Sequence, residues 1–218
     1  MILQQHALES IPSLPVWVEI ITIMTVSAYG AAVARSRNVP VVGTLLAGLI
    51  VGLGGGIFRD LLLGMPPITI SQAPFAPASL VAAIFGAIFF YKLVTQEIPN
   101  LIIDGIALGL LISIGAQKAL VHGFPVFSVL LCGVFTACIG GTILDVLTRH
   151  RPAIVSQAHW FASALTAGAV CYWGVSTYID PYLGIIATVC LTMSLRAISV
   201  VKNWPAPKWP GESENMDV

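Results

Sequence analysis

Two aspartates stand inside long apolar segments of this chain, each a few residues after a group of glycines. One segment reads Gly54-Gly55-Gly56-Ile-Phe-Arg59-Asp60, and the other reads Gly140-Gly141-Thr-Ile-Leu-Asp145. A carboxylate in an apolar segment is costly and usually faces a polar interior or a water-filled cavity. The chemistry available to such groups is electrostatic, because acidic entrances concentrate cations and repel anions. These residues therefore indicate a route for cations through an apolar environment.

The glycines next to the aspartates predict an irregular helix. Each glycine weakens a helix by about 1 kcal/mol relative to alanine, so we expect a kink or a short unwound stretch at Gly54, Gly55 and Gly56, and another at Gly140 and Gly141. Irregular backbone is tolerated at membrane depth only against protein or a water-filled cavity. Close helix packing is the alternative, since small residues recur every four positions here. A nucleotide site is not indicated, because no strand precedes the glycines.

Two further acids accompany this pattern. Glu19 and Asp104 each begin an apolar segment. We expect Glu19 at the same end of the route as Asp60, and Asp104 at the same end as Asp145. The alternative is that both acids sit at the membrane interface, where the dipole of a helix start favours them.

The two basic residues near this pattern are Arg59 and Lys118. Arg59 has no counterpart in the second motif, so we expect it either to pair with an acid or to project into the route as a barrier. Lys118 is expected to interact with Glu19 or Asp60 and to respond to voltage. It could equally extend to lipid headgroups.

The composition excludes a soluble domain. Of 218 residues, 57% are apolar and only 9% are charged, whereas a soluble domain carries about 25% charged residues. Ten basic and ten acidic residues cancel, which gives no bulk attraction to nucleic acid. No catalytic motif and no metal-ligand spacing is present, so neither an enzyme nor a cofactor is expected. The chain is predicted to be an all-α integral membrane protein.

Seven segments are apolar and long enough to cross a bilayer, which takes about 20 residues. They are residues 16–34, 41–63, 78–94, 101–121, 125–147, 159–178 and 182–201. Residues 1–15 are expected to lie outside the membrane, and the tail at 203–218 is expected to be a disordered cytoplasmic segment. Basic residues favour the cytoplasmic side, and they place the N-terminus outside and the C-terminus inside. On that side would lie Arg35, Arg37, Lys92, Arg149, Arg151, Arg196, Lys202 and Lys208.

An internal repeat relates the first third of the chain to the second. A gapless shift of 85 residues places matching residue types on one another, among them Gly30 on Gly115, Pro40 on Pro125, Gly55 on Gly140, Asp60 on Asp145 and Pro67 on Pro152. Each copy contains three spans, an odd number, so the second copy must run through the membrane in the opposite direction. This is the inverted-repeat architecture, which places a pathway between the copies. The units are residues 16–94 and 101–178, with a seventh helix at 182–202.

With these motifs, the chain resembles the prokaryotic TRIC family, the trimeric intracellular cation channels. The resemblance rests on residues 54–60, on residues 140–145 and on the pattern of three, three and one spans. It implies a homotrimer in the bacterial or archaeal cell membrane, surrounded by lipid, with one pore in each subunit that passes potassium and other monovalent cations. It also implies that Lys118 takes part in gating, and it implies no nucleotide and no nucleic-acid partner.

By the same Gly-Gly-Gly-x-x-Arg-Asp signature, the chain also resembles a related group of bacterial membrane proteins to which glycine transport is attributed. That resemblance leaves a carrier of a small zwitterion as the alternative, with Arg59 and an acid holding its carboxylate and amine. A membrane scaffold without transport activity is a third hypothesis.

Overall fold

The computed structural model of the protein describes residues 14–154 and 161–202, and all regular structure in this part of the chain is helical. The elements are α2 (Val16–Ser36), α3 (Val41–Leu62), α4 (Ile68–Ser71), α5 (Phe75–Phe85), the π-helix η1 (Gly86–Phe90), α6 (Tyr91–Val94), α7 (Glu97–Val121), α8 (Val126–Leu147), α9 (Phe161–Tyr178) and α10 (Pro181–Val201). The predicted N-terminal segment up to residue 13, the start of the sixth span at 159–160 and the predicted disordered tail at 203–218 lie outside the described residues.

The helices have the length and surface of membrane-spanning elements. In the described part of the chain, six spans are long and apolar enough to cross a bilayer, and one of them, Phe75–Val94, comprises α5, η1 and α6. Large apolar side chains face outward, such as Val41 at 77% exposed and Phe127 at 70%. α9, with 18 residues, is not among these six spans, and it packs beside α10. The prediction of an all-α multi-pass membrane protein is confirmed.

One irregular turn interrupts the third span, where none was predicted. The chain passes through the π-helix η1 between α5 and α6. The Arg35 guanidinium donates to the carbonyl of Ala87 in this turn and lies 3.8 Å above the centre of the Tyr91 ring. These contacts stabilise the turn, because a π-turn departs from the normal pairing of helix carbonyls.

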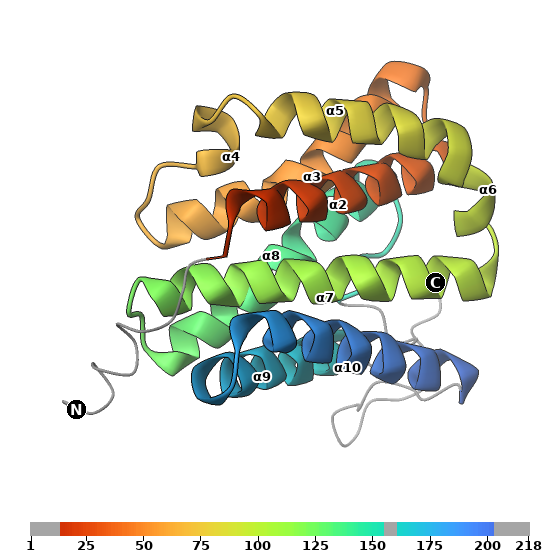
Figure 1. The fold of residues 1–218 in the computed structure, drawn as a ribbon. Helices are drawn as coiled ribbons and strands as arrows, with labels where there is room; N and C mark the ends of the chain where they lie inside the picture. Colours follow the sequence, from red (N-terminus) through yellow and green to blue (C-terminus); the bar gives the residue numbers. More distant parts are fainter. Residues whose placement is uncertain (1–13, 155–160, 203–218) are drawn as a thin grey trace, which may run out of the picture.

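The two halves of the chain have the same structure in opposite directions. In Figure 1, α2 runs from left to right, whereas its counterpart α7 runs from right to left. Equivalent bonds also recur at the 85-residue offset: the Met65 amide donates to the Asp60 carbonyl, and the His150 amide donates to the Asp145 carbonyl, both at 2.8 Å. The structure thus has the predicted inverted three-helix halves, with α10 as the additional helix.

The centre of the molecule is formed by α3 and α8, which cross at the glycines. A Cβ atom on Gly55 would lie 2.2 Å from the Thr136 carbonyl oxygen, and one on Gly140 would lie 2.5 Å from the Val51 carbonyl oxygen. Gly140 is the repeat counterpart of Gly55, and Thr136 is the repeat counterpart of Val51, because each pair is 85 residues apart. The contacts are therefore reciprocal, as a pseudo-two-fold axis between the halves requires.

The predicted unwinding of the helices at the glycines is wrong. Both α3 and α8 are continuous α-helices through Gly54, Gly55, Gly56, Gly140 and Gly141. Gly55 and Gly140 instead allow the two backbones to approach each other, which is the alternative of close packing. Regular backbone hydrogen bonds persist because an apolar interior has no water to replace them.

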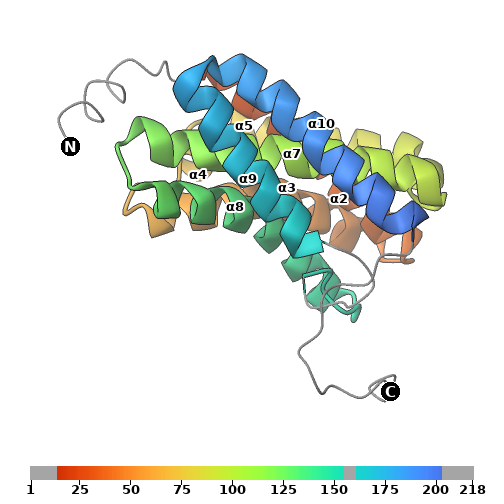
Figure 2. The same ribbon diagram turned by 90° about the horizontal axis from the view of Figure 1, so that it is seen from below.

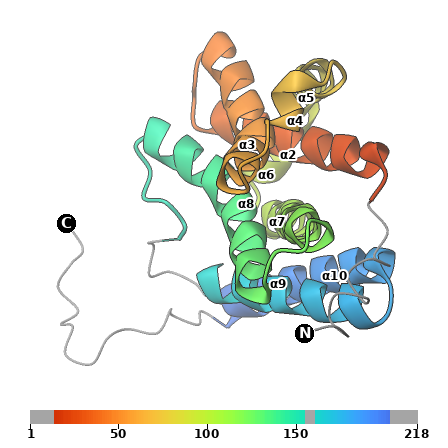
Figure 3. The same ribbon diagram turned by 90° about the vertical axis from the view of Figure 1, so that its left-hand side faces the viewer.

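The remaining helices surround this crossing. Figure 3, which looks roughly along the helices, shows α2, α3 and α5 in the upper part, α7 and α8 in the middle, and α9 and α10 below. Figure 2, seen from below, shows α9 and α10 in front of α7 and α8. Apolar residues from both halves share one core, including Val26, Val51, Ile112 and Ala137. The polar groups of the site lie at the two ends of this core.

Candidate functional site

A buried cluster of four charged residues closes one end of the interface between the halves. We call Glu19, Arg59, Asp60 and Lys118 the Asp60 cluster. Lys118 Nζ and Arg59 Nε both lie 2.8 Å from Asp60 Oδ1, and Arg59 Nη1 lies 3.9 Å from Glu19 Oε1. The side chains of Asp60, Arg59 and Lys118 are only 0%, 2% and 8% exposed. Helices α3 and α7 are therefore joined by charges shielded from water, and the partly exposed Glu19 of α2 approaches them.

Asp60 also fixes the chain that follows its own helix. Its Oδ2 atom accepts a hydrogen bond of 3.0 Å from the Ile68 amide, so the segment after α3 folds back over the helix end. Asp145 does the same at the other end, where its Oδ2 accepts from the Ala153 amide at 3.3 Å. Each aspartate thus has a structural function in its own half and pairs with a cation of the opposite half, Lys118 of α7 for Asp60 and Arg37 after α2 for Asp145.

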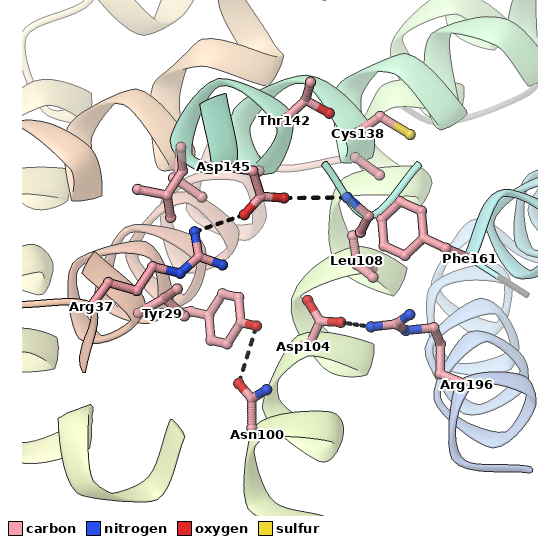
Figure 4. A pocket seen from close by; sticks show the side chains of 16 residues that line it. Tyr29, Arg37, Asn100, Asp104, Leu108, Cys138, Thr142, Asp145, Phe161 and Arg196 are labelled. Atoms are coloured by element: carbon pink, nitrogen blue, oxygen red, sulfur yellow. Dashed lines mark hydrogen bonds and ion pairs between the residues drawn. The ribbon is translucent and has the colours of Figure 1, made fainter. Parts of the chain in front are cut away.

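A second charged cluster lies at the opposite end, around an open cavity. We call Arg37, Asp104, Asp145 and Arg196 the Asp145 cluster (Figure 4). Arg37 Nη1 lies 2.8 Å from Asp145 Oδ1, and Arg196 Nη2 contacts Asp104 Oδ2. These four side chains are between 13% and 22% exposed. This end is therefore more accessible to water than the Asp60 cluster.

The cavity beside the Asp145 cluster has a volume of about 150 Å³ and is bounded by helices from both halves. Within it, the Tyr29 hydroxyl donates to Asn100 Oδ1 at 3.2 Å, and Cys138 and Thr142 lie on the α8 wall (Figure 4). The floor of the cavity includes Val51, one of the residues at the α3–α8 crossing.

At the Asp60 end the free space is divided. A space of about 20 Å³ touches Arg59, Glu19 and Thr136, and a larger one of about 250 Å³ lies between Val16, Lys118 and His122. Val51 and Thr136, which bound the spaces at the two ends, belong to the close contacts of the α3–α8 crossing. Close packing at the α3–α8 crossing therefore lies between the small space at the Asp60 end and the cavity at the Asp145 end.

The charges at the two ends differ from the sequence prediction. The predicted pair of acids is present at each end, but each cluster also contains two bases, so neither entrance is acidic. The carboxylates are neutralised because Arg59 and Lys118 at one end, and Arg37 and Arg196 at the other, complete the clusters. Arg59 pairs with Asp60 and approaches Glu19, and Lys118 binds Asp60 rather than extending to lipid.

Sequence reasoning missed several residues of the Asp145 cluster. Arg37 follows the end of α2 and was assigned only to a cytoplasmic loop, and Arg196 belongs to α10, which has no counterpart in the repeat. Tyr29 and Asn100 carried no motif. The one signal in the sequence was the offset of 85 residues, which places Arg37 on His122, a residue close to Lys118. This signal was too weak to identify the ion pair between Arg37 and Asp145.

Comparison with known proteins places this geometry in a family. The family described as glycine transporter matches residues 16–94 and 101–177, which are the two inverted halves. The chain belongs to the glycine transporter family. A membrane protein of the UPF0126 group from Deinococcus radiodurans is 25% identical over 185 residues, with 84% of this chain and 86% of the relative covered.

This chain has the same fold as solved structures of TRIC channels. The TRIC trimeric intracellular cation channel orthologue from Rhodobacter sphaeroides is 26% identical, with a TM-score of 0.76 over 86% of this chain and 97% of that one. A TRIC cation channel solved to explain conductance is 28% identical, with a TM-score of 0.74 over 90% and 97% of the two chains. The resemblance predicted from the glycine motifs is confirmed, and the chain has a membrane fold of the channel and transporter type.

Proposed function

We propose that this glycine transporter family member is a channel for monovalent cations, potassium among them, with its pore between the inverted halves. One observation carries the proposal: two charged clusters stand at opposite ends of the interface between the halves, in a fold shared with TRIC cation channels. Conduction needs no cofactor and no chemical step. The described structure corresponds to a closed state, because packed protein separates the cavities at the two ends.

The proposal is tested by recording the purified protein in a planar bilayer with a potassium chloride gradient. We expect discrete current steps and a reversal potential near the equilibrium potential of potassium. A reversal potential at zero, or current without unitary steps, would contradict a cation-selective pore. Unchanged flux after Asp60 and Asp145 are both neutralised would place these clusters outside the pathway, as the scaffold hypothesis requires.

Lys118 is proposed to hold the gate closed from the last turn of α7. Its ammonium links α7 to Asp60 on α3, and Asp60 keeps Arg59 as a partner when Lys118 is replaced. We expect Lys118→Gln to raise the open probability about fivefold, as loss of about 1 kcal/mol of closed-state stability gives. Single-channel recording measures this change. Lys92→Gln, at an exposed lysine of α6, is the matched control, and equal open probabilities in the two variants would refute the proposed gate.

The proposed assembly and membrane location rest on the same similarity to TRIC channels. We infer a homotrimer surrounded by membrane lipid, with a pore in each subunit, in a bacterial or archaeal cell membrane. The basic residues favour an outer N-terminus and a cytoplasmic C-terminus, which puts the Asp60 cluster outside and the Asp145 cluster inside. The chain is not proposed to be an enzyme.

Carriage of a small zwitterion such as glycine is the second candidate function. It is favoured by the mixed charge of both clusters, since guanidinium and carboxylate groups stand side by side at each end, and by the family description. Saturable counterflow of labelled glycine into liposomes, without unitary currents, would favour this carrier over the channel.

A further inference from the structure

The two ion pairs of the Asp145 cluster differ in the neighbours that hold them. Arg37 also donates to Thr148 Oγ1 at 2.7 Å, and Asp145 also accepts from the Ala153 amide. Both partners of this pair are thus fixed by neighbours on α8 and in the loop after it. The pair is part of the scaffold of the cavity.

In the pair between Asp104 and Arg196, Asp104 interacts with the Tyr29 hydroxyl, whereas Arg196 has an unused donor. The Arg196 guanidinium lies over the Phe161 ring, 4.9 Å from its centre. Its Nε atom is buried and makes no hydrogen bond with any residue in the described ranges. A buried guanidinium nitrogen without a partner is costly, so this side chain has unused capacity to bind an acceptor.

The cavity next to this pair has the size of a small molecule. Its volume of about 150 Å³ corresponds to roughly five water molecules at about 30 Å³ each. Val33, Leu108 and Phe161 line it beside the charged groups. Apolar walls next to a few fixed polar groups are typical of ligand sites, and here they limit the ligand to a few non-hydrogen atoms.

The charges select a dipolar ligand. A cation alone would meet the two guanidinium groups of Arg37 and Arg196, and an anion alone would meet the carboxylates of Asp104 and Asp145. An ammonium and a carboxylate joined through one carbon can face an acid and a guanidinium that already stand in contact. Charged hydrogen bonds of this kind are the stronger ones in proteins.

We propose that this cavity binds a small α-amino acid as its zwitterion, with the ammonium on Asp104 and the carboxylate on Arg196. The ligand inserts between the two side chains and replaces their direct contact, while the pair between Arg37 and Asp145 stays closed. Glycine and alanine fit this space. The inference rests on the second candidate function for its ligand class and assigns that class a site.

Isothermal titration calorimetry of the full chain in lipid nanodiscs tests the site, with glycine as the probe. We expect saturable binding of glycine and none of glycinamide, which lacks the carboxylate, or of acetate, which lacks the ammonium. Asp104→Asn and Arg196→Gln should each weaken glycine binding at least about tenfold, because each removes a hydrogen bond to a charged group. Glu97→Gln, at an exposed acid on the same helix α7, is the matched control and should bind as the parent chain does.

A variant that keeps every charge separates binding from folding. Val33→Phe fills part of the cavity from α2 and should also abolish glycine binding, while the chain elutes as the parent protein does in size-exclusion chromatography. Absence of glycine binding to the parent chain, or equal binding of glycinamide, would overturn the inference. Unweakened binding by folded Asp104→Asn would do the same. Potassium currents recorded without glycine test the channel separately, so failure of one proposal is distinguishable from failure of the other.

Discussion

Gly55→Ala is expected to destabilise the protein by about 3 kcal/mol, the upper part of the usual range for overpacking a core. The added methyl group would lie 2.2 Å from the Thr136 carbonyl oxygen. That oxygen belongs to the backbone of α8, so the contact is relieved only if the two helices move apart. Gly140→Ala should act alike, because its methyl group would lie 2.5 Å from the Val51 carbonyl oxygen on α3.

The neighbouring glycines provide matched controls for this prediction. A Cβ atom on Gly54 would have its nearest neighbour 4.0 Å away, and one on Gly141 would have nothing within 4 Å. Gly54→Ala and Gly141→Ala should therefore be neutral, or stabilising by up to about 1 kcal/mol through the higher helix propensity of alanine. Thermal unfolding of the four variants in detergent measures the difference. Equal stabilities of Gly54→Ala and Gly55→Ala would contradict the close crossing of α3 and α8.

Asp60→Asn should produce the largest loss of stability among the charged residues. It would leave the cations of Arg59 and Lys118 without the carboxylate that pairs with both, in a place where these side chains are almost inaccessible to water. Removing one partner of a buried ion pair costs about 3–5 kcal/mol, because an uncompensated charge stays buried. Glu19, which is 3.9 Å from Arg59, compensates only part of this loss.

Asp145→Asn is the matched control, because Asp145 is the repeat counterpart of Asp60. Its partner Arg37 is 22% exposed, and Asp145 itself is 14% exposed, so water can solvate the cation that is left behind. We expect a loss of about 1 kcal/mol, as for an accessible ion pair. Unfolding of the two variants in the same detergent gives the comparison. An equal or larger loss in Asp145→Asn would show that the two ends are equally closed to water.

Much of the fold was predictable because helix position follows from local sequence. Apolar segments bounded by proline placed α3 and α8 within a residue or two of their observed ends. The shift of 85 residues relates the bounds of these two helices to each other. An odd number of spans per copy then requires opposite directions, because each span reverses the side of the membrane on which the chain emerges.

The sequence pattern did not predict that α3 and α8 remain helical at their glycines. Helix propensity measures the cost of glycine in an isolated helix, and on that measure Gly54, Gly55 and Gly56 indicated a break. In the folded protein the cost is offset by the contact of Gly55 with α8. A propensity contains no information on which backbone lies opposite the glycine.

The sequence by itself determined that this chain is a helical membrane protein with two inverted halves and with aspartates at opposite ends of their interface. Periodicity, hydropathy and the repeat are properties of position along the chain, which is why they were sufficient. Only the tertiary structure decided which cation of the other half pairs with each aspartate, Lys118 with Asp60 and Arg37 with Asp145. Such pairs join residues far apart in sequence. Their strength and accessibility depend on burial, which appears only when the helices pack.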